Sequence, residues 1–232
     1  EELLLMADII GGFFTEEDLA KGKGIISPSL KLEIKKASVK YCEDEMKNKT
    51  SYNFEEMEHY FNGELSKCFH DDRLPEKSLP FLMKKEARMI DAVTDIKCSG
   101  GKYGLGYIEG EKNIDPSYWA FKAHFKNDPV FPGTHMLNGA NQLLLFFAIH
   151  FGIYDGDENN RPAILNDLTM NIAFRGQVQC EISKILYRID VKKVIKEQHS
   201  TSIIVEVNIM WKSINVIREE NMSLKFNTKG GE

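Results

Sequence analysis

The segment from about Met136 to Phe151 constrains the fold most, because it has the composition of a helix with hardly any polar face. A helix that is apolar on all sides is buried on all sides. The segment is too short to cross a bilayer, which takes about 20 apolar residues, and Asn138, Asn141, Gln142 and His150 interrupt it. We therefore expect a core helix that the rest of the domain wraps, and no membrane span.

Three segments nearer the C-terminus alternate apolar and polar residues with a period of two. They lie at residues 185–191, 203–211 and 222–226. Successive side chains of a strand point to opposite faces, so this period predicts long strands with one apolar face each. One buried helix followed by long antiparallel strands predicts an α+β domain in which a sheet curls around that helix.

A histidine and a Pro-Gly pair precede the predicted helix. Pro132 suits a first helical position because it has no N–H to leave unpaired, and Gly133 lets a ligand approach the free N–H groups of the first turn. His124 would then act as a base, while the positive end of the helix stabilises a developing oxyanion. The alternative is a core histidine beside an ordinary turn.

A polar stripe marks one side of the predicted helix near its N-terminal end. Its members, which fall at helical spacing, are Thr134, Asn138, Asn141 and Gln142. Buried amides are costly without hydrogen-bond partners. The stripe therefore either meets a polar network or lines a cavity that receives polar substrate atoms.

The sequence around this stripe resembles a known family. Residues 124–133 are His-Phe-x-x-Asp-Pro-Val-x-Pro-Gly, with Trp119-x-Phe121 before them and the apolar helix after them. In that helix a polar residue follows five after the glycine, and a glutamine follows one turn later. The pattern is similar to that of the bacterial β-hydroxyacyl-ACP dehydratase and isomerase family. The resemblance implies the hot-dog fold, a long antiparallel sheet wrapped around one central buried helix.

The resemblance covers residues 79–226, including the segments 79–83, 90–94 and 103–111. Residues 11–20 and 54–65 are also similar to an inter-domain linker of the dehydratase domains in polyunsaturated fatty acid synthases. We therefore expect residues 1–78 to be a linker or the end of a preceding hot-dog-like region. Residues 79–232 are expected to form a dehydratase-like hot-dog domain.

The resemblance implies a role for each residue of the motif. His124 matches the catalytic base, and the Gly133 N–H matches the donor that polarises the thioester carbonyl. Asn138 stands where the family has aspartate or glutamate, and an amide carries no acidic proton. Losing a general acid costs on the order of 10²–10⁴ in rate. The residues expected to bind the substrate beside these are Gln142, Phe131 and Thr134.

The activity implied by the resemblance is dehydration of 3-hydroxyacyl thioesters to 2-enoyl thioesters in fatty acid or polyketide synthesis. The substrate would be carried on the phosphopantetheine of an acyl carrier protein, with no cofactor bound by the chain. The family places its site between two hot-dog domains, so a second copy or another domain of a multidomain synthase is an expected partner. Two alternatives remain, a catalytically silent hot-dog partner that completes an acyl-binding site and a hot-dog thioesterase.

Composition and motifs argue against two other classes of function, nucleic-acid binding and metal binding. The net charge is −5 and no basic patch is interleaved with aromatics, so nucleic acid is not an expected ligand. No histidine falls into a His-Glu-x-x-His or comparable pattern, so no metal is expected. The four cysteines lack Cys-x-x-Cys spacing and no signal-peptide pattern opens the chain, which predicts free thiols in the cytoplasm.

Overall fold

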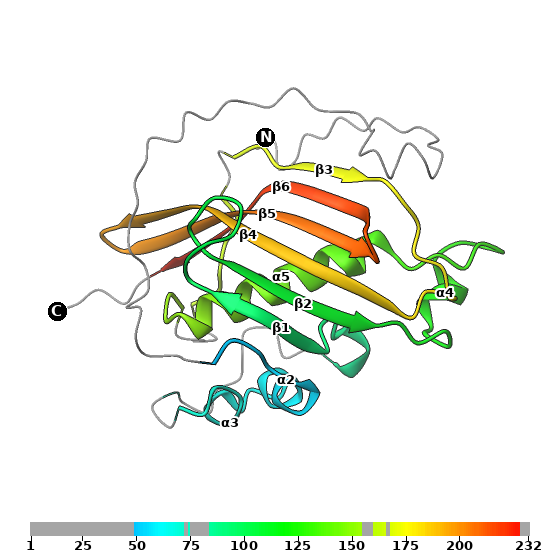
Figure 1. The fold of residues 1–232 in the computed structure, drawn as a ribbon, viewed down its shortest axis with the longest axis horizontal. Coiled ribbons are helices and arrows are strands. Elements are labelled where there is room, and N and C mark those ends of the chain that lie inside the picture. The colour runs from blue at the N-terminus through cyan, green and yellow to red at the C-terminus, as the bar shows by residue number, and fades with distance from the viewer. Residues whose placement is uncertain (1–48, 72–73, 75–83, 155–159, 166–167, 228–232) are drawn as a thin grey trace, which may run out of the picture.

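The computed structural model describes residues 49–71, 74, 84–154, 160–165 and 168–227. Within these residues, a six-stranded antiparallel sheet curves around one long helix, α5 (Gly133–His150) (Figure 1). This arrangement confirms the predicted α+β hot-dog architecture. The strands, in the order in which they pair, are β1 (Ala92–Lys97), β2 (Tyr107–Asn113), β4 (Lys184–Glu197), β5 (Ser200–Trp211), β6 (Ile214–Asn227) and β3 (Asn171–Phe174).

The three segments with a period of two lie within β4, β5 and β6, as predicted. The edge strand β3 was not predicted, because four residues are too few to show an alternation. Its place in the sheet comes from pairing with β6, where Phe174 lies opposite Ile217. Short helices connect or flank the strands: α2 (Phe54–Phe61), α3 (Leu65–Phe69), the 3-10 helix η1 (Lys85–Ala87) and α4 (Ala120–Ala123).

Helix α5 begins three residues before the predicted Met136 and ends one residue before the predicted Phe151. Pro132 is the capping residue with extended backbone (ψ 128°), not the first helical residue as predicted. Its carbonyl accepts hydrogen bonds from the N–H groups of His135 (3.1 Å) and Met136 (3.3 Å), and these two bonds start the helix one turn early. Gly133 therefore occupies the first helical position.

Two glycines let α5 lie close against the sheet. A Cβ atom at Gly139 would lie 2.4 Å from Tyr187 Oη, and one at Gly110 would lie 3.1 Å from Leu143 Cδ1. Gly110 of β2 and Tyr187 of β4 are direct cross-strand partners. An added Cβ would overlap Tyr187 at Gly139 and would make Leu143 shift at Gly110, so the two glycines allow the close approach of helix and sheet along this row.

The helices α2 and α3 lie beside β1, at the opposite edge of the sheet from β3 (Figure 1). Tyr52, just before α2, pairs with Val93 of β1 and bonds His150 at the end of α5, with 2.8 Å between Tyr52 Oη and His150 Nδ1. Met57 and Leu65 join the same hydrophobic core as α5. Residues 49–71 thus pack on the hot-dog domain, whereas residues 1–48 and 75–83 lie outside the described residues, so the boundary at residue 79 stays a prediction.

The outer face of the sheet carries a buried polar network. Glu206 of β5 is only 3% exposed and accepts hydrogen bonds from Lys102 Nζ (2.6 Å) and Tyr103 Oη (2.8 Å). Burial alone would raise the pKa of Glu206, but these two donors and the charge of Arg218 outweigh it and lower the pKa to about 2. The network fastens the loop between β1 and β2 to the outside of the sheet.

Cys68 and Cys180 are free, but Cys98 is disulfide-bonded, so the prediction of four free thiols is wrong for Cys98. Cys42 lies outside the described residues. In the described part of the chain, no helix is long and apolar enough to span a membrane.

Candidate active site

His124 lies at the C-terminal end of α4, where its backbone N–H donates to Ala120 O over 2.9 Å. Its side chain is exposed, which rules out the core-histidine alternative. Nδ1 lies 3.1 Å from Val130 O. A carbonyl only accepts, so Nδ1 carries the hydrogen of the neutral ring and Nε2 keeps its lone pair. The loop that follows α4 thereby holds the neutral ring of His124 with its Nε2 unprotonated.

Gly133 opens α5 beneath the ring of Phe174. A Cβ atom at Gly133 would lie 2.5 Å from Phe174 Cε1, so only glycine fits here without moving that ring. Phe174 belongs to the row that carries the helix, because it pairs with Ile217, Ile217 pairs with Ile209, and Ile209 pairs with Tyr187. The first-turn N–H groups of α5 thus lie next to the edge strand β3, and they supply a fixed positive partial charge there.

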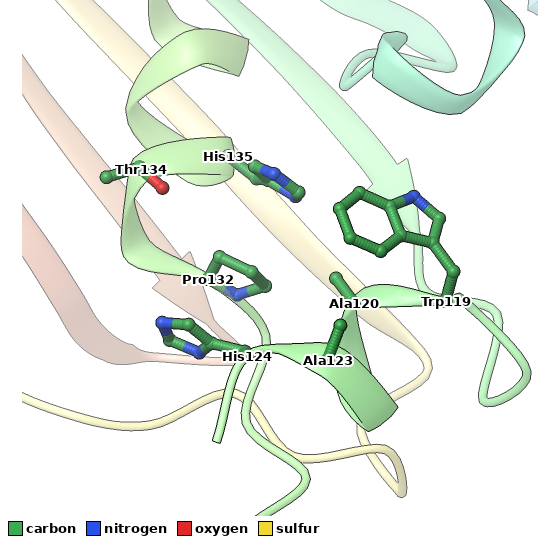
Figure 2. Close-up of a pocket in the computed structure, with 7 residues that line it drawn as sticks. All are labelled: Trp119, Ala120, Ala123, His124, Pro132, Thr134 and His135. Carbon is green, nitrogen blue, oxygen red and sulfur yellow. The ribbon is translucent and has the colours of Figure 1, made fainter. Parts of the chain in front are cut away.

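A pocket of about 180 Å³ lies between α4 and the first turn of α5 (Figure 2). Its lining residues are Trp119, Ala120, Ala123, His124, Pro132, Thr134 and His135. Of the predicted site residues, His124 and Thr134 meet here, next to Gly133. Phe131 is 2% exposed and stacks on Tyr118 with 5.4 Å between ring centres, so it supports the pocket from the core.

The polar stripe of α5 divides between two environments. Gln142 meets a network: its Oε1 accepts from Met89 N (2.9 Å) and its Nε2 donates to Ala87 O (2.9 Å). These bonds hold the segment after η1 against the helix. Asn138, one turn before Gln142, is half-buried, while Thr134 is exposed. Neither Asn138 nor Gln142 lines the pocket of the single chain, and their roles toward a substrate stay predictions.

Sequence reasoning missed two residues of the pocket as site residues, His135 and Trp119. His135 is half-buried, and Trp119 is 53% exposed with its ring centre 5.7 Å from that of His135. The signal for His135 was its position two residues after Gly133, which puts it on the first turn of α5. Among the described residues, no group of three or more histidine, cysteine or acidic side chains is arranged to hold a metal ion.

Comparisons with known proteins show the family of the chain. The model of the FabA-like domain family matches residues 82–219, so the chain belongs to this family. The chain is also 30% identical over 217 residues to a subunit of the polyunsaturated fatty acid synthase from Thraustochytrium sp.. That match covers 90% of this chain but 14% of the relative, so the chain spans only a small part of the relative's length.

Solved structures with a similar fold are more distant. A hypothetical thioesterase with coenzyme A from Streptococcus pneumoniae is 8% identical, with a TM-score of 0.36 over 60% of this chain and 86% of that one. A mutant thioesterase from Pseudomonas aeruginosa is 6% identical, with a TM-score of 0.36 over 58% of this chain and 81% of that one. At this distance neither structure bears on the function of the pocket.

Proposed function

We propose that this chain is a dehydratase domain of a multidomain fatty acid or polyketide synthase. Its substrate would be a 3-hydroxyacyl thioester carried on the phosphopantetheine of an acyl carrier protein, with no further cofactor, in the cytoplasm. The observation that carries the proposal is His124, an exposed imidazole with Nδ1 held by Val130 O, beside a glycine at the first position of a buried helix. A base and a helix N-terminus are the two elements that proton abstraction next to a carbonyl requires.

The proposed reaction uses each of these groups once. His124 Nε2 takes the proton from C2, and the Gly133 N–H holds the thioester oxygen as negative charge develops on it. The electron pair then forms the C2=C3 bond as the C3–O bond breaks, and the departing hydroxide takes a proton from solvent to become water. Asn138 would hold that hydroxyl through its amide, which donates a hydrogen bond but cannot deliver a proton.

A second hot-dog domain is the proposed partner. The edge strand β3 and the residue before it leave apolar side chains uncovered in the single chain, with Met170 42%, Ile172 36% and Phe174 54% exposed. In the described part of the chain no strand pairs with the outer edge of β3, and such an edge beside exposed apolar residues favours association. In size-exclusion chromatography with light scattering, we expect about twice the chain mass of 26.5 kDa. A monomer at working concentration would mean that the partner is a different domain.

Asn138 favours one competing function, a catalytically silent partner that supplies shape to an acyl site. The test compares this chain with Asn138→Asp in the hydration of a crotonyl thioester and in the release of free thiol. We expect Asn138→Asp to raise hydration by roughly tenfold or more, because it restores a proton donor at the family's acid position. The half-buried environment of position 138 favours the protonated form of this aspartic acid, whereas the positive end of α5 favours its ionised form.

The outcomes separate the three functions. Hydration by both chains, faster in the Asn138→Asp variant, supports the dehydratase. Negligible hydration by both chains supports the silent partner. Release of thiol without hydration identifies a thioesterase. Asn141→Asp, on the exposed side of the same helix, is the matched control and should change neither rate.

A further inference from the structure

The pocket contains a second imidazole that the proposed mechanism leaves unused. His135 lies on the first turn of α5, and His124 lies on the other side of Pro132, at the end of α4 (Figure 2). Both belong to one chain and line the same pocket. A substrate in this pocket would therefore meet two titratable side chains without any contribution from a partner.

A chain of hydrogen bonds fixes the tautomer of His135. Tyr118 Oη donates its hydrogen to Glu86 O over 2.8 Å and lies 3.2 Å from His135 Nδ1. A hydroxyl has one hydrogen, so toward His135 it must accept, and Nδ1 carries the ring hydrogen. The rings of Trp119 and Phe131 hold the imidazole from two sides, with ring centres 5.7 and 6.0 Å away. His135 Nε2 thus keeps its lone pair, as His124 Nε2 does.

The two imidazoles disfavour double protonation. Burial, followed by the charge of His124, holds the pKa of His135 below its usual value. The Tyr118 hydroxyl that bonds His135 and the Trp119 indole beside its ring are neutral, and the charge of Glu86 acts on Tyr118. A positive charge on one imidazole therefore disfavours a second positive charge on the other in the same pocket.

The spacing of α5 relates His135 to the amide at the family's acid position. His135 precedes Asn138 by three residues, so the two side chains are neighbours on the helix surface. Asn138 has no proton to transfer, whereas an imidazole transfers protons near neutral pH. Building on the proposed function, we propose that His135 is a second catalytic residue, which exchanges the proton of the oxygen at C3 while His124 exchanges the proton at C2.

The proposed step balances in the direction of hydration. The water oxygen bonds to C3 of the enoyl thioester as His135 Nε2 takes one of its protons. The π pair of C2=C3 moves toward the thioester carbonyl, and C2 then takes the proton of His124 Nε2. Water has been added, His135 has gained a proton and His124 has lost one. Transfer of one proton through solvent restores the starting state, and dehydration follows the same steps in reverse.

The experiment measures kcat/KM for hydration of crotonyl pantetheine from acidic to alkaline pH. The variants are His135→Gln, which can still donate to Tyr118, and His135→Leu, which cannot. If His135 transfers a proton, both variants lose on the order of 10²-fold or more. The unchanged chain should lose activity at low pH as His135 becomes protonated, and this acidic limb should vanish in both variants. His199→Gln, at the exposed turn between β4 and β5, is the matched control and should behave as the unchanged chain.

The results separate failure of this inference from failure of the proposed function. If His124→Ala abolishes hydration and His135→Gln does not, the dehydratase stands and the role of His135 is refuted. If His135→Gln restores what His135→Leu loses, His135 only positions the pocket. If the unchanged chain does not hydrate the substrate, both proposals fall. Nitrogen NMR of the imidazoles provides a readout without turnover: the His135 Nε2 signal should be that of an unprotonated nitrogen and should shift when crotonyl pantetheine is added.

Discussion

His124→Ala is expected to reduce the hydration of a crotonyl thioester by on the order of 10²–10⁴. Alanine leaves no group at this position to exchange the C2 proton. The loss should appear in kcat as well as in kcat/KM, because the interaction with the C2 proton forms only as the reaction proceeds. The rates are measured with substrate below and above saturation.

The fold should survive this change. His124 is exposed and its ring makes one hydrogen bond, to Val130 O. We expect the free energy of unfolding to change by no more than about 1.5 kcal/mol. His199→Ala, an equally exposed histidine on the far hairpin, is the control and should keep full activity. Full turnover in a well-folded His124→Ala chain would show that another residue is the base.

Glu219→Gln is expected to stabilise the chain by about 3 kcal/mol above neutral pH. Glu219 of β6 is 4% exposed and lies between its cross-strand partners Val207 and Ile172, on the face of the sheet that packs on α5. Burial raises its pKa from 4.5 to about 7. The folded chain therefore holds this proton at pH values where the unfolded chain has lost it.

The free energy of unfolding should decrease as pH rises, because the folded chain holds this proton at pH values where the unfolded chain does not. Below about pH 4.5 the carboxyl is protonated in both states, and Glu219 costs the fold nothing through ionisation. As pH rises from about 4.5 to about 7, the carboxyl ionises in the unfolded chain before it does so in the folded chain, and the free energy of unfolding falls progressively. Above about pH 7 the whole of this decrease is present. Glutamine resembles the protonated acid and does not titrate, so its advantage should appear only as pH rises through this window.

Denaturant unfolding at about pH 4.5, 6 and 8 measures this effect across the window. Glu220→Gln is the matched control, because Glu220 is the next residue of β6 but points to the outer face and pairs with Arg218 over 2.7 Å. Glu220→Gln should be neutral or slightly destabilising at the alkaline end of the window. A stability gain for Glu219→Gln that is the same at every pH would show that packing, and not the charge of Glu219, is responsible.

Local regularities made much of the fold predictable. The apolar run of α5 and the period of two in β4, β5 and β6 are properties of consecutive residues, and the structure confirms them. The segment from His124 to Gly133 could be predicted as a candidate site for the same reason: one short loop brings the histidine to the start of the helix. Pro132 shows the limit of this approach, because the hydrogen bonds to its carbonyl moved the helix start by a turn.

The other features of the fold and of the candidate site depend on contacts between residues that are far apart in the sequence. Phe174 covers Gly133 because β3 pairs with β6, although 41 residues of chain separate the two positions, 174 and 133. The amide of Gln142 bonds the backbone of Ala87 and Met89, more than 50 residues earlier in the chain. In both cases, the sequence around one residue gives no sign of the distant residue that it contacts.

The sequence by itself thus determined the class of fold, the central helix and the motif that places a histidine before a helix N-terminus, because each follows from spacing along the chain. Only the tertiary structure decided that His135 shares the pocket of His124 and that Glu219 is buried without a charged partner among the described residues. Burial and hydrogen bonding depend on which elements meet in space. The strand order of the sheet decides which elements pack together, and the local period of the sequence does not encode that order.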